Sequence, residues 1–506
     1  VRRYDIGLRL TCLFLLGVSL LCPSLTSASP DAGTAPPPPA LTRPYEPEGP
    51  PRQERRDPPD IDGVDEPDRD TVDYLLLAPR TLLFPVYLVT EYGIRWPIGQ
   101  LIIVVERENV IEKTVDFFTF ADGDAGFLPV LEISTGEADS YGARFFYRPS
   151  DYEGLRFDQS VSGNPGRNLH LETRLDVPVD LGPSTITSRV GFNHVDDEPF
   201  FGVGPTTDIE AESDFAELSL AGRVGWQVGA ENDPAGATLA VGLVDRRIQC
   251  TGEGDDDVCG ADGVFGTADD ILTAEATGVA PLGRDYGMAH LDWRGYWDSR
   301  QAEAGPDPGL PFLEAEVSDG SFGDTAYGLG LHRLSSRSGI RLEGFGRLGL
   351  GLDGEVSVIR YGAEIAGFWD IFGSWRRLLG LRIQAAAADP LAGDRVPVSE
   401  LTTLGGVETH RGFRRHTFRG RSALLATLDY RYPVWSFMQG VLFADIGNVF
   451  GPHWQDLHVD RLRSSFGLGF HSVELLDRHT SYDLNLAVGT APFGEGFELV
   501  NLRVNL

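Results

Sequence analysis

An acidic segment in the middle of the chain carries the residues best suited to bind a metal ion. Carboxylates recur at Asp255, Asp257, Asp262, Asp269 and Asp270, with glycines between them. Calcium loops require hard carboxylate oxygens and sharp glycine turns, although the strict EF-hand spacing is absent here. The segment therefore indicates either a calcium site or a solvated acidic loop, and the sequence leaves both open.

Two cysteines stand at the start of this acidic segment. Cys250 and Cys259 are separated by eight residues. Proteins that leave the cytoplasm form disulfides readily, and a bond between these two would close a small ring. We predict a Cys250–Cys259 disulfide.

The remaining polar side chains show no arrangement typical of an enzyme. The ten histidines are scattered without metal-ligand spacing, and no G-x-S-x-G nucleophile elbow occurs. His410 and His416 flank Arg411 and could titrate beside it, but a structural role is the simpler interpretation. We predict no enzymatic activity and no cofactor, apart from calcium in the acidic loop.

Charge and composition narrow the class of protein. Lys and Arg number 43 against 75 Asp and Glu, which gives a formal net charge of −32. A chain this acidic is poorly suited to nucleic acid, whose phosphates need a basic face. The 42% hydrophobic content excludes bulk disorder. The 61 glycines and 10% aromatic residues favour many short strands and tight turns.

The first 70 residues do not resemble a folded domain. Residues 1–28 combine Arg2 and Arg3, a short apolar core and small residues near 27–29, a pattern typical of a secretory signal peptide. Residues 29–70 are rich in proline and charge, which predicts an extended or disordered linker.

Residues 71–121 form a third segment, in which apolar clusters alternate with prolines. Within it, residues 106–120 place Val110, Ile111, Val115 and Phe118 on one helical face. No apolar run reaches the roughly 18 residues of a transmembrane helix. We predict a short helical segment at the periplasmic mouth or in the lumen of the domain that follows.

From about residue 122 to the end, apolar and polar residues alternate with period two between turn-forming residues. About sixteen such segments are expected, near 126–137, 144–147, 168–175, 184–195, 217–228, 237–249, 284–297, 310–334, 339–350, 357–370, 376–387, 421–432, 438–447, 464–474, 481–488 and 497–506. At roughly ten residues per tilted strand, residues 122–506 fit an all-β, 16-stranded antiparallel transmembrane β-barrel. A soluble propeller or pair of sandwiches is the alternative. Unequal loops, aromatics near strand ends and the absence of a blade repeat favour the barrel.

The most specific motifs lie between residues 404 and 450. They read Leu404-Gly405-Gly406, Arg411-Gly412-Phe413, Leu428-Asp429-Tyr430-Arg431-Tyr432-Pro433 and Leu442-Phe443-Ala444-Asp445-Ile446-Gly447-Asn448-Val449. In order and spacing they resemble the C-terminal barrel signature of the BamA/TamA-type superfamily of outer-membrane assembly barrels, also called the bacterial surface antigen family. The segment Glu198-Pro199-Phe200-Phe201-Gly202-Val203-Gly204-Pro205 also resembles a recurrent segment of these proteins. Because no POTRA-like modules precede the barrel region, the resemblance is to the subgroup that lacks them.

The resemblance implies a structural lock inside the barrel. In the family an arginine-glycine-aromatic loop tip folds into the lumen, and its arginine pairs with acidic residues on the wall. The matching positions are Arg411, Gly412 and Phe413 for the tip, and Asp429 and Asp445 for the wall. Independently of the family, a carboxylate facing lipid is costly, so both aspartates are expected to face the lumen.

The resemblance also implies a function. The expected role is to assist insertion or translocation of proteins or lipids in the outer membrane of a Gram-negative bacterium. Its expected partners are outer-membrane lipid, lipopolysaccharide and client membrane proteins, and no nucleic acid. The alternatives are a passive pore for small solutes or lipids, and a structural surface antigen.

Overall fold

A computed structural model of the chain was analysed. Contacts divide the chain into residues 1–60 and 61–506, and every described residue belongs to the second unit. The structure describes residues 81, 84–85, 87–96, 117–134, 140–152, 154–164, 167–180, 183–207, 213–229, 234–250, 285–300, 338–352, 354, 356–371, 377–392, 395–406, 409–435, 438–473, 481–490 and 498–504. The predicted signal peptide, the linker and the acidic loop of residues 251–284 lie outside this range.

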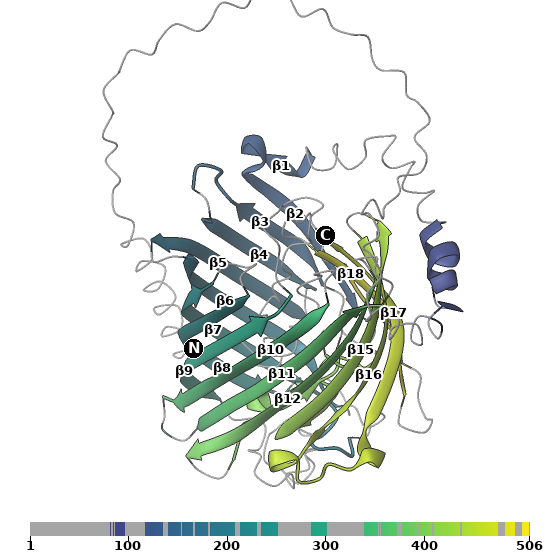
Figure 1. The fold of residues 1–506 in the computed structure, drawn as a ribbon. Coiled ribbons are helices and arrows are strands. Elements are labelled where there is room, and N and C mark those ends of the chain that lie inside the picture. Colours follow the sequence, from purple (N-terminus) through teal and green to yellow (C-terminus); the bar gives the residue numbers. More distant parts are fainter. Residues whose placement is uncertain are drawn as a thin grey trace, which may run out of the picture. The chain divides into compact units, whose positions relative to one another are not determined.

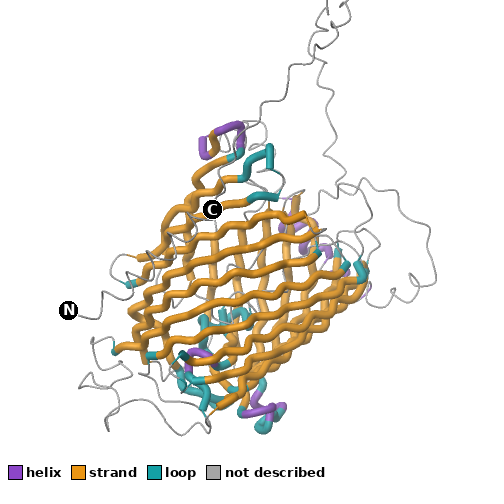
Figure 2. The backbone as a smooth tube through the Cα atoms, turned by 90° about the vertical axis from the view of Figure 1, so that its left-hand side faces the viewer, coloured by secondary structure: helices purple, strands orange, loops and turns teal. Residues whose placement is uncertain are grey.

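The described part of the second unit is all-β, and most of it is one large antiparallel sheet (Figures 1 and 2). Its main strands are β2 (Ala125–Ser134), β3 (Ser140–Tyr147), β4 (Arg156–Asn164), β5 (Asn168–Asp180), β6 (Pro183–Phe200), β7 (Ser213–Val228), β8 (Ala235–Gln249), β9 (Tyr286–Asp298), β10 (Gly339–Gly351), β11 (Ser357–Asp370), β12 (Leu378–Ala392), β15 (Ser422–Trp435), β16 (Met438–Phe450), β17 (Arg463–Val473), β18 (Ser481–Thr490) and β19 (Glu498–Val504). Each strand pairs with the next in this order, including β12 with β15.

The last strand of this series also pairs with the first. β19 pairs with β2 from Asn501↔Ser134 to Val504↔Leu131. By contrast, β7 and β8 pair along almost their whole length, from Ala216↔Gln249 to Val228↔Ala237. Within the described residues, the β19–β2 pairing is therefore much the shorter of the two.

Alternation along the strands gives the sheet two chemically different faces. On β7, Phe215 and Ser219 are buried, whereas Val224 and Trp226 on the opposite face are exposed. The face that also carries Asp429 and Asp445 is called the inner face below, and the opposite one the outer face. Successive side chains on a strand point to opposite faces, so the period-two pattern in the sequence corresponds to the two different faces of the sheet.

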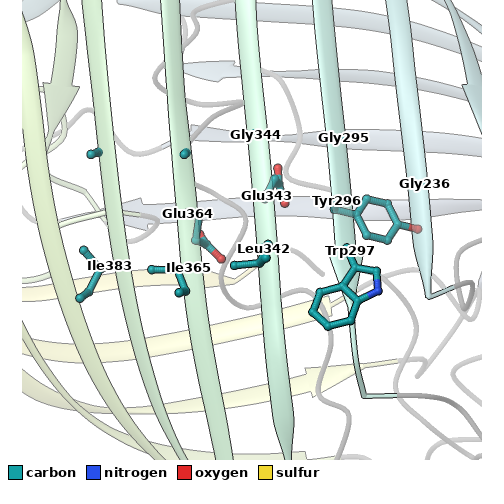
Figure 3. Close-up of a pocket in the computed structure, with 12 residues that line it drawn as sticks. Gly236, Gly295, Tyr296, Trp297, Leu342, Glu343, Gly344, Glu364, Ile365 and Ile383 are labelled. Atoms are coloured by element: carbon teal, nitrogen blue, oxygen red, sulfur yellow. The ribbon is translucent and has the colours of Figure 1, made fainter.

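The same alternation is visible around β10 and β11 (Figure 3). Glu343 and Glu364 are buried and directly opposite each other, while Leu342, Ile365 and Ile383 are exposed. These side chains line a cavity of about 690 Å³. Arg294 and Arg341 hydrogen-bond to Glu343, and Gln384 to Glu364, so each of the facing carboxylates has a partner.

One connection turns back onto the inner face instead of leaving the sheet. Between β12 and β15 the chain forms the short helix η4 (Val398–Glu400) and the two-stranded hairpin β13 (Thr402–Leu404) with β14 (Phe418–Gly420). Leu404, Phe413 and Phe418 of this segment pack into a buried cluster with Phe345 and Leu425 of the wall. Residues 395–421 are called the infolded loop below.

The described part of residues 71–121 is small. Residues 81, 84–85 and 87–88 are helical and precede η1 (Val89–Arg95), which contacts β15. Residues 117–118 are helical, but Thr119–Phe120 form β1, which pairs with β2, so the amphipathic pattern at 106–120 ends in a strand. No helix in the described residues has the length and apolar content that would let it cross a membrane.

One strand of the structure was missed, and one predicted strand is not tested by it. β4 was not predicted, because its residues contain only Phe157 and Val161 as large apolar side chains. The weak pattern at 310–334 lies outside the described residues.

Candidate functional site

The structure brings the three charged residues of the predicted lock together in one buried cluster. The Arg411 guanidinium donates from Nε to Oδ2 of Asp445 (2.8 Å) and from Nη2 to Oδ1 of Asp445 (2.7 Å). Nη2 also donates to Oδ1 of Asp429 at 2.9 Å. All three side chains are buried. This two-pronged contact is the geometry in which an arginine holds carboxylates most strongly.

Neighbouring wall strands present the two carboxylates. β15 and β16 pair so that Thr427 lies opposite Asp445, and Asp429 opposite Phe443. Residues 427, 429, 443 and 445 therefore share the inner face. The Phe443 ring lies under the guanidinium, with 3.6 Å from Arg411 Cζ to the ring centroid, which adds a cation–π contact.

The tip of the infolded loop is shaped to deliver Arg411. Gly412 has φ of 89°, in the left-handed region that favours glycine, so the chain reverses directly after the arginine. The Arg411 backbone N–H donates to Asp445 as well (3.2 Å). Phe413 stacks edge-on against Phe418 with 4.9 Å between ring centroids, which fixes the tip from its apolar side.

The cluster of Arg411, Asp429 and Asp445, called the clasp below, is electrically balanced by Arg431. Arg431 lies 3.5 Å from Asp429, so two guanidinium groups face two carboxylates. Although burial opposes a charged guanidinium, Asp445 and Asp429 raise the pKa of Arg411 above its ordinary value. Burying charge is costly unless the charges are paired and hydrogen-bonded, and Arg411 with its two carboxylates meets both conditions.

A second ionic anchor holds the start of the infolded loop and was not found from the sequence. Glu400, on η4, accepts hydrogen bonds from the Tyr286 hydroxyl (2.8 Å) and from Arg360 Nη1 (3.2 Å). Although burial favours the neutral acid, Arg360 and nearby arginines hold the pKa of Glu400 below its ordinary value. Nothing in the sequence near Glu400 marks it, because its partners come from β9 and β11.

A third anchor holds the far end of the loop. Glu198, on β6, accepts from Arg419 Nη2 at 2.6 Å and hydrogen-bonds to His416 Nδ1. The backbone N–H of Gly204 also donates to the Arg419 carbonyl at 2.8 Å. The segment from Glu198 to Pro205 stood out in the sequence as similar to a recurrent segment of the family. That similarity was the available signal for this anchor.

His410, next to Arg411, is buried among rings. It packs against Phe413 and Phe418, at 4.7 and 5.8 Å between ring centroids. Within the described residues neither ring nitrogen has a hydrogen-bond partner. Burial lowers the pKa of His410 to about 4, so the ring is neutral at physiological pH.

The predicted metal and disulfide residues fall mostly outside the described part of the chain. This holds for Cys259 and for all five aspartates of the acidic loop. Cys250 is described and is disulfide-bonded. No group of three or more potential metal ligands occurs among the residues that the structure describes.

One family model matches part of the chain. Residues 332–473 match the family model described as "Omp85 superfamily domain". This range contains Arg411, Asp429 and Asp445, and the match confirms the resemblance inferred from the motifs at 404–450. No curated protein sequence matches the chain.

Two solved structures show limited similarity to the chain. BamA from Haemophilus ducreyi lacking POTRA domains 1-3 is 11% identical, with 76% of this chain and 70% of that chain covered and a TM-score of 0.46. CdiB from Acinetobacter baumannii is 12% identical, with 74% of this chain and 58% of that chain covered and a TM-score of 0.40.

Proposed function

We propose, from the Omp85 superfamily domain that the chain carries in residues 332–473, that the protein is an outer-membrane barrel that inserts or secretes other macromolecules. The observation that carries the proposal is the Arg411 clasp inside that domain. Its two aspartates lie on the adjacent strands β15 and β16, as the family motif requires.

We propose further that the sheet closes into a 16-stranded barrel. The pairing of β19 with β2 supports closure, because it removes the free edges that lipid would not tolerate. The faces support it too: buried Arg347, Arg360 and Asp445 lie on the inner face, and exposed Leu243, Leu342 and Ile365 on the outer face. Such a chain would lie in the outer membrane with lipid and lipopolysaccharide around it.

The infolded loop favours an assembly role over a passive pore. Three ionic anchors hold the loop against the inner face at Glu198, Glu400 and Arg411. A loop fixed in this way would narrow an open channel, and it would brace β15 and β16 while strands elsewhere separate. The short β19–β2 pairing is the natural place for such separation. A pore and a structural surface antigen remain the competing functions.

The proposal is tested with Arg411→Ala in the full chain, reconstituted in lipid vesicles. An unfolded, urea-denatured small outer-membrane barrel serves as client, and its insertion is followed by heat-modifiable gel mobility. We expect a fall in insertion rate of at least tenfold, because the buried aspartates lose their partner. Arg247→Ala, at a half-exposed ion pair with Asp245, is the matched control.

Conductance separates the competing functions. Unchanged client insertion by Arg411→Ala, or ion flow through the wild-type protein with no client insertion, would overturn the assembly role. We also propose that the protein performs no catalysis, so client insertion should proceed without any chemical change to the client or to lipid.

A further inference from the structure

The outer face has one buried patch where exposure is expected. On β15, Leu428 is 45% exposed, but Tyr430, two residues further along the same face, is only 4% exposed and Tyr432 is fully buried. Leu379, Leu442 and Phe470 of the neighbouring strands complete the cluster. Since the outer face carries exposed apolar residues elsewhere, something must cover it here.

The N-terminal helix η1 and the residues before it contact this patch. Arg377, at the start of β12, forms the link: its Nη1 donates to the Tyr430 hydroxyl at 3.5 Å, and its Nη2 donates to Glu91. The Tyr87 ring lies against the same guanidinium, at 4.4 Å from centroid to Cζ. Thr90 is buried, and its hydroxyl donates to the Tyr87 carbonyl at 3.0 Å. Tyr87, Thr90 and Glu91 therefore form the side of the helix that faces the protein, and η1 contacts β15.

The adjoining side of the helix is apolar and exposed. Phe84, Leu88, Tyr92 and Trp96 are 52%, 41%, 66% and 63% exposed. They are spaced four residues apart, so on a helix they form one continuous stripe. The stripe contains no charged residue, and its two C-terminal members are a tyrosine and a tryptophan.

We propose that residues 84–96 are an interfacial helix whose stripe lies in the headgroup region of the lipid bilayer, held against the outside of the barrel by Arg377. The proposal rests on the proposed membrane barrel. The occupant is lipid because the outer face is itself apolar and exposed on β15, the strand that η1 contacts, and on the two strands after it, at Leu428, Ile446 and Phe466. Tyrosine and tryptophan are the residues enriched at the membrane–water boundary.

This placement keeps residues 84–96 out of the lumen. The sequence suggested the periplasmic mouth or the lumen for the segment, whereas Tyr87 and Glu91 contact Arg377, which hydrogen-bonds to Tyr430 on the outer face. As a helix lying on the outer wall, they leave the opening of the barrel free for a client.

The test uses single-cysteine labelling of the full chain in phosphatidylcholine–phosphatidylglycerol vesicles. Tyr92→Cys carries an environment-sensitive fluorophore, and Tyr152→Cys is the matched control, an exposed tyrosine in the turn between β3 and β4. Quenching by doxyl-labelled lipid and by aqueous iodide is measured for each. We expect lipid quenching at residue 92 to exceed that at residue 152 at least threefold, with iodide quenching reversed.

Two outcomes overturn the inference. If iodide quenches residue 92 as strongly as residue 152, the stripe faces water. If neither quencher reaches residue 92, a protein partner or a second copy covers it. A label at Phe466→Cys, on the outer face of β17, separates this inference from the proposed function. If lipid quenches residue 466 but not residue 92, only the helix inference fails; if lipid reaches neither, the membrane barrel fails.

Discussion

At the scale of single residues, the clasp shows why a buried arginine can be stable in this protein. Arg411 is surrounded by Asp429, Asp445 and the Phe443 ring, so its charge and its donors are matched inside the fold. The family resemblance named both aspartates, and the cost of a carboxylate facing lipid independently predicted that they face the lumen. Arg411 itself was identified only through the family motif, since no periodicity governs a loop.

The sequence alone could not identify the other loop anchors, Glu400, Glu198 and Arg419, and the reason is physical. Each pairs with a residue at least 40 positions away in the chain, and the pairing depends on how the loop folds back. Local patterns carry no information about such contacts. Glu198 is the partial exception, because its own segment looked family-like.

His410 predicts a pH dependence of stability. Because burial lowers its pKa to about 4 from 6.5, the unfolded chain binds a proton between these values and the folded chain does not. His410 therefore makes its full contribution to the stability of the fold above pH 6.5. This contribution is lost as the pH falls from 6.5 towards 4. Below pH 4 the effect of His410 on the free energy of unfolding no longer changes. The shift corresponds to a loss on the order of 3 kcal/mol.

The measurement compares thermal unfolding midpoints of the wild type and His410→Phe from pH 7.5 to 4.0. Phenylalanine keeps the ring packing against Phe413 and Phe418 but cannot take up a proton. The variant should lose part of the wild-type decline between pH 6.5 and 4. Parallel curves for the two proteins would rule out His410 as the cause.

At the scale of elements, the infolded loop is held by ionic contacts at several points along its length. The Glu198 anchor at its far end involves both His416 and Arg419. A hydrogen bond to a charged group contributes about 1.5–3 kcal/mol. Local opening of the loop is therefore expected to become more frequent when Glu198 loses its charge.

Glu198→Gln should raise trypsin cleavage after Arg414 and Arg415 by about tenfold, since each 1.4 kcal/mol changes an opening equilibrium by about that factor. Asp158→Asn is the control, because Asp158 pairs with Arg144 on the wall and does not touch the loop. Equal cleavage in the two variants would show that Glu198 does not hold the loop.

The strand elements were largely predictable, and the exception is informative. β7 alternates strongly over its whole length, so its position followed from the sequence. β4 contains serines, glycine and charges around only two large apolar residues, yet it pairs fully with β3 and β5. Its neighbours impose strand geometry on a segment whose own preference is weak, because sheet formation is governed by context.

At the scale of the whole molecule, the proposed function depends on the junction of β19 with β2. The described pairing there spans four residue pairs, and Leu502 lies opposite Ile133. If clients enter the membrane at this junction, a covalent link across it should stop client insertion.

The prediction concerns the double variant Leu502→Cys with Ile133→Cys. Oxidation should reduce the rate of client insertion at least tenfold, and reduction should restore it. The control is the double variant Leu442→Cys with Leu468→Cys, a facing pair on β16 and β17. Its rate of client insertion should not change on oxidation. Full activity of the oxidised β19–β2 variant would exclude this junction as the site of insertion.

The strand β15 makes ionic or hydrogen-bonded contacts on both its inner and its outer face, and this has a mechanical consequence. Asp429 and Tyr430 are consecutive residues, and they hold Arg411 on one side of the wall and Arg377 on the other. The helix η1 and the tip of the infolded loop are thus linked to β15 from opposite faces, at two residues joined by one peptide bond. A force that pulls on η1 would therefore act on β15, the same strand whose Asp429 binds Arg411. The N-terminal segment and the tip of the infolded loop are thus mechanically coupled through β15.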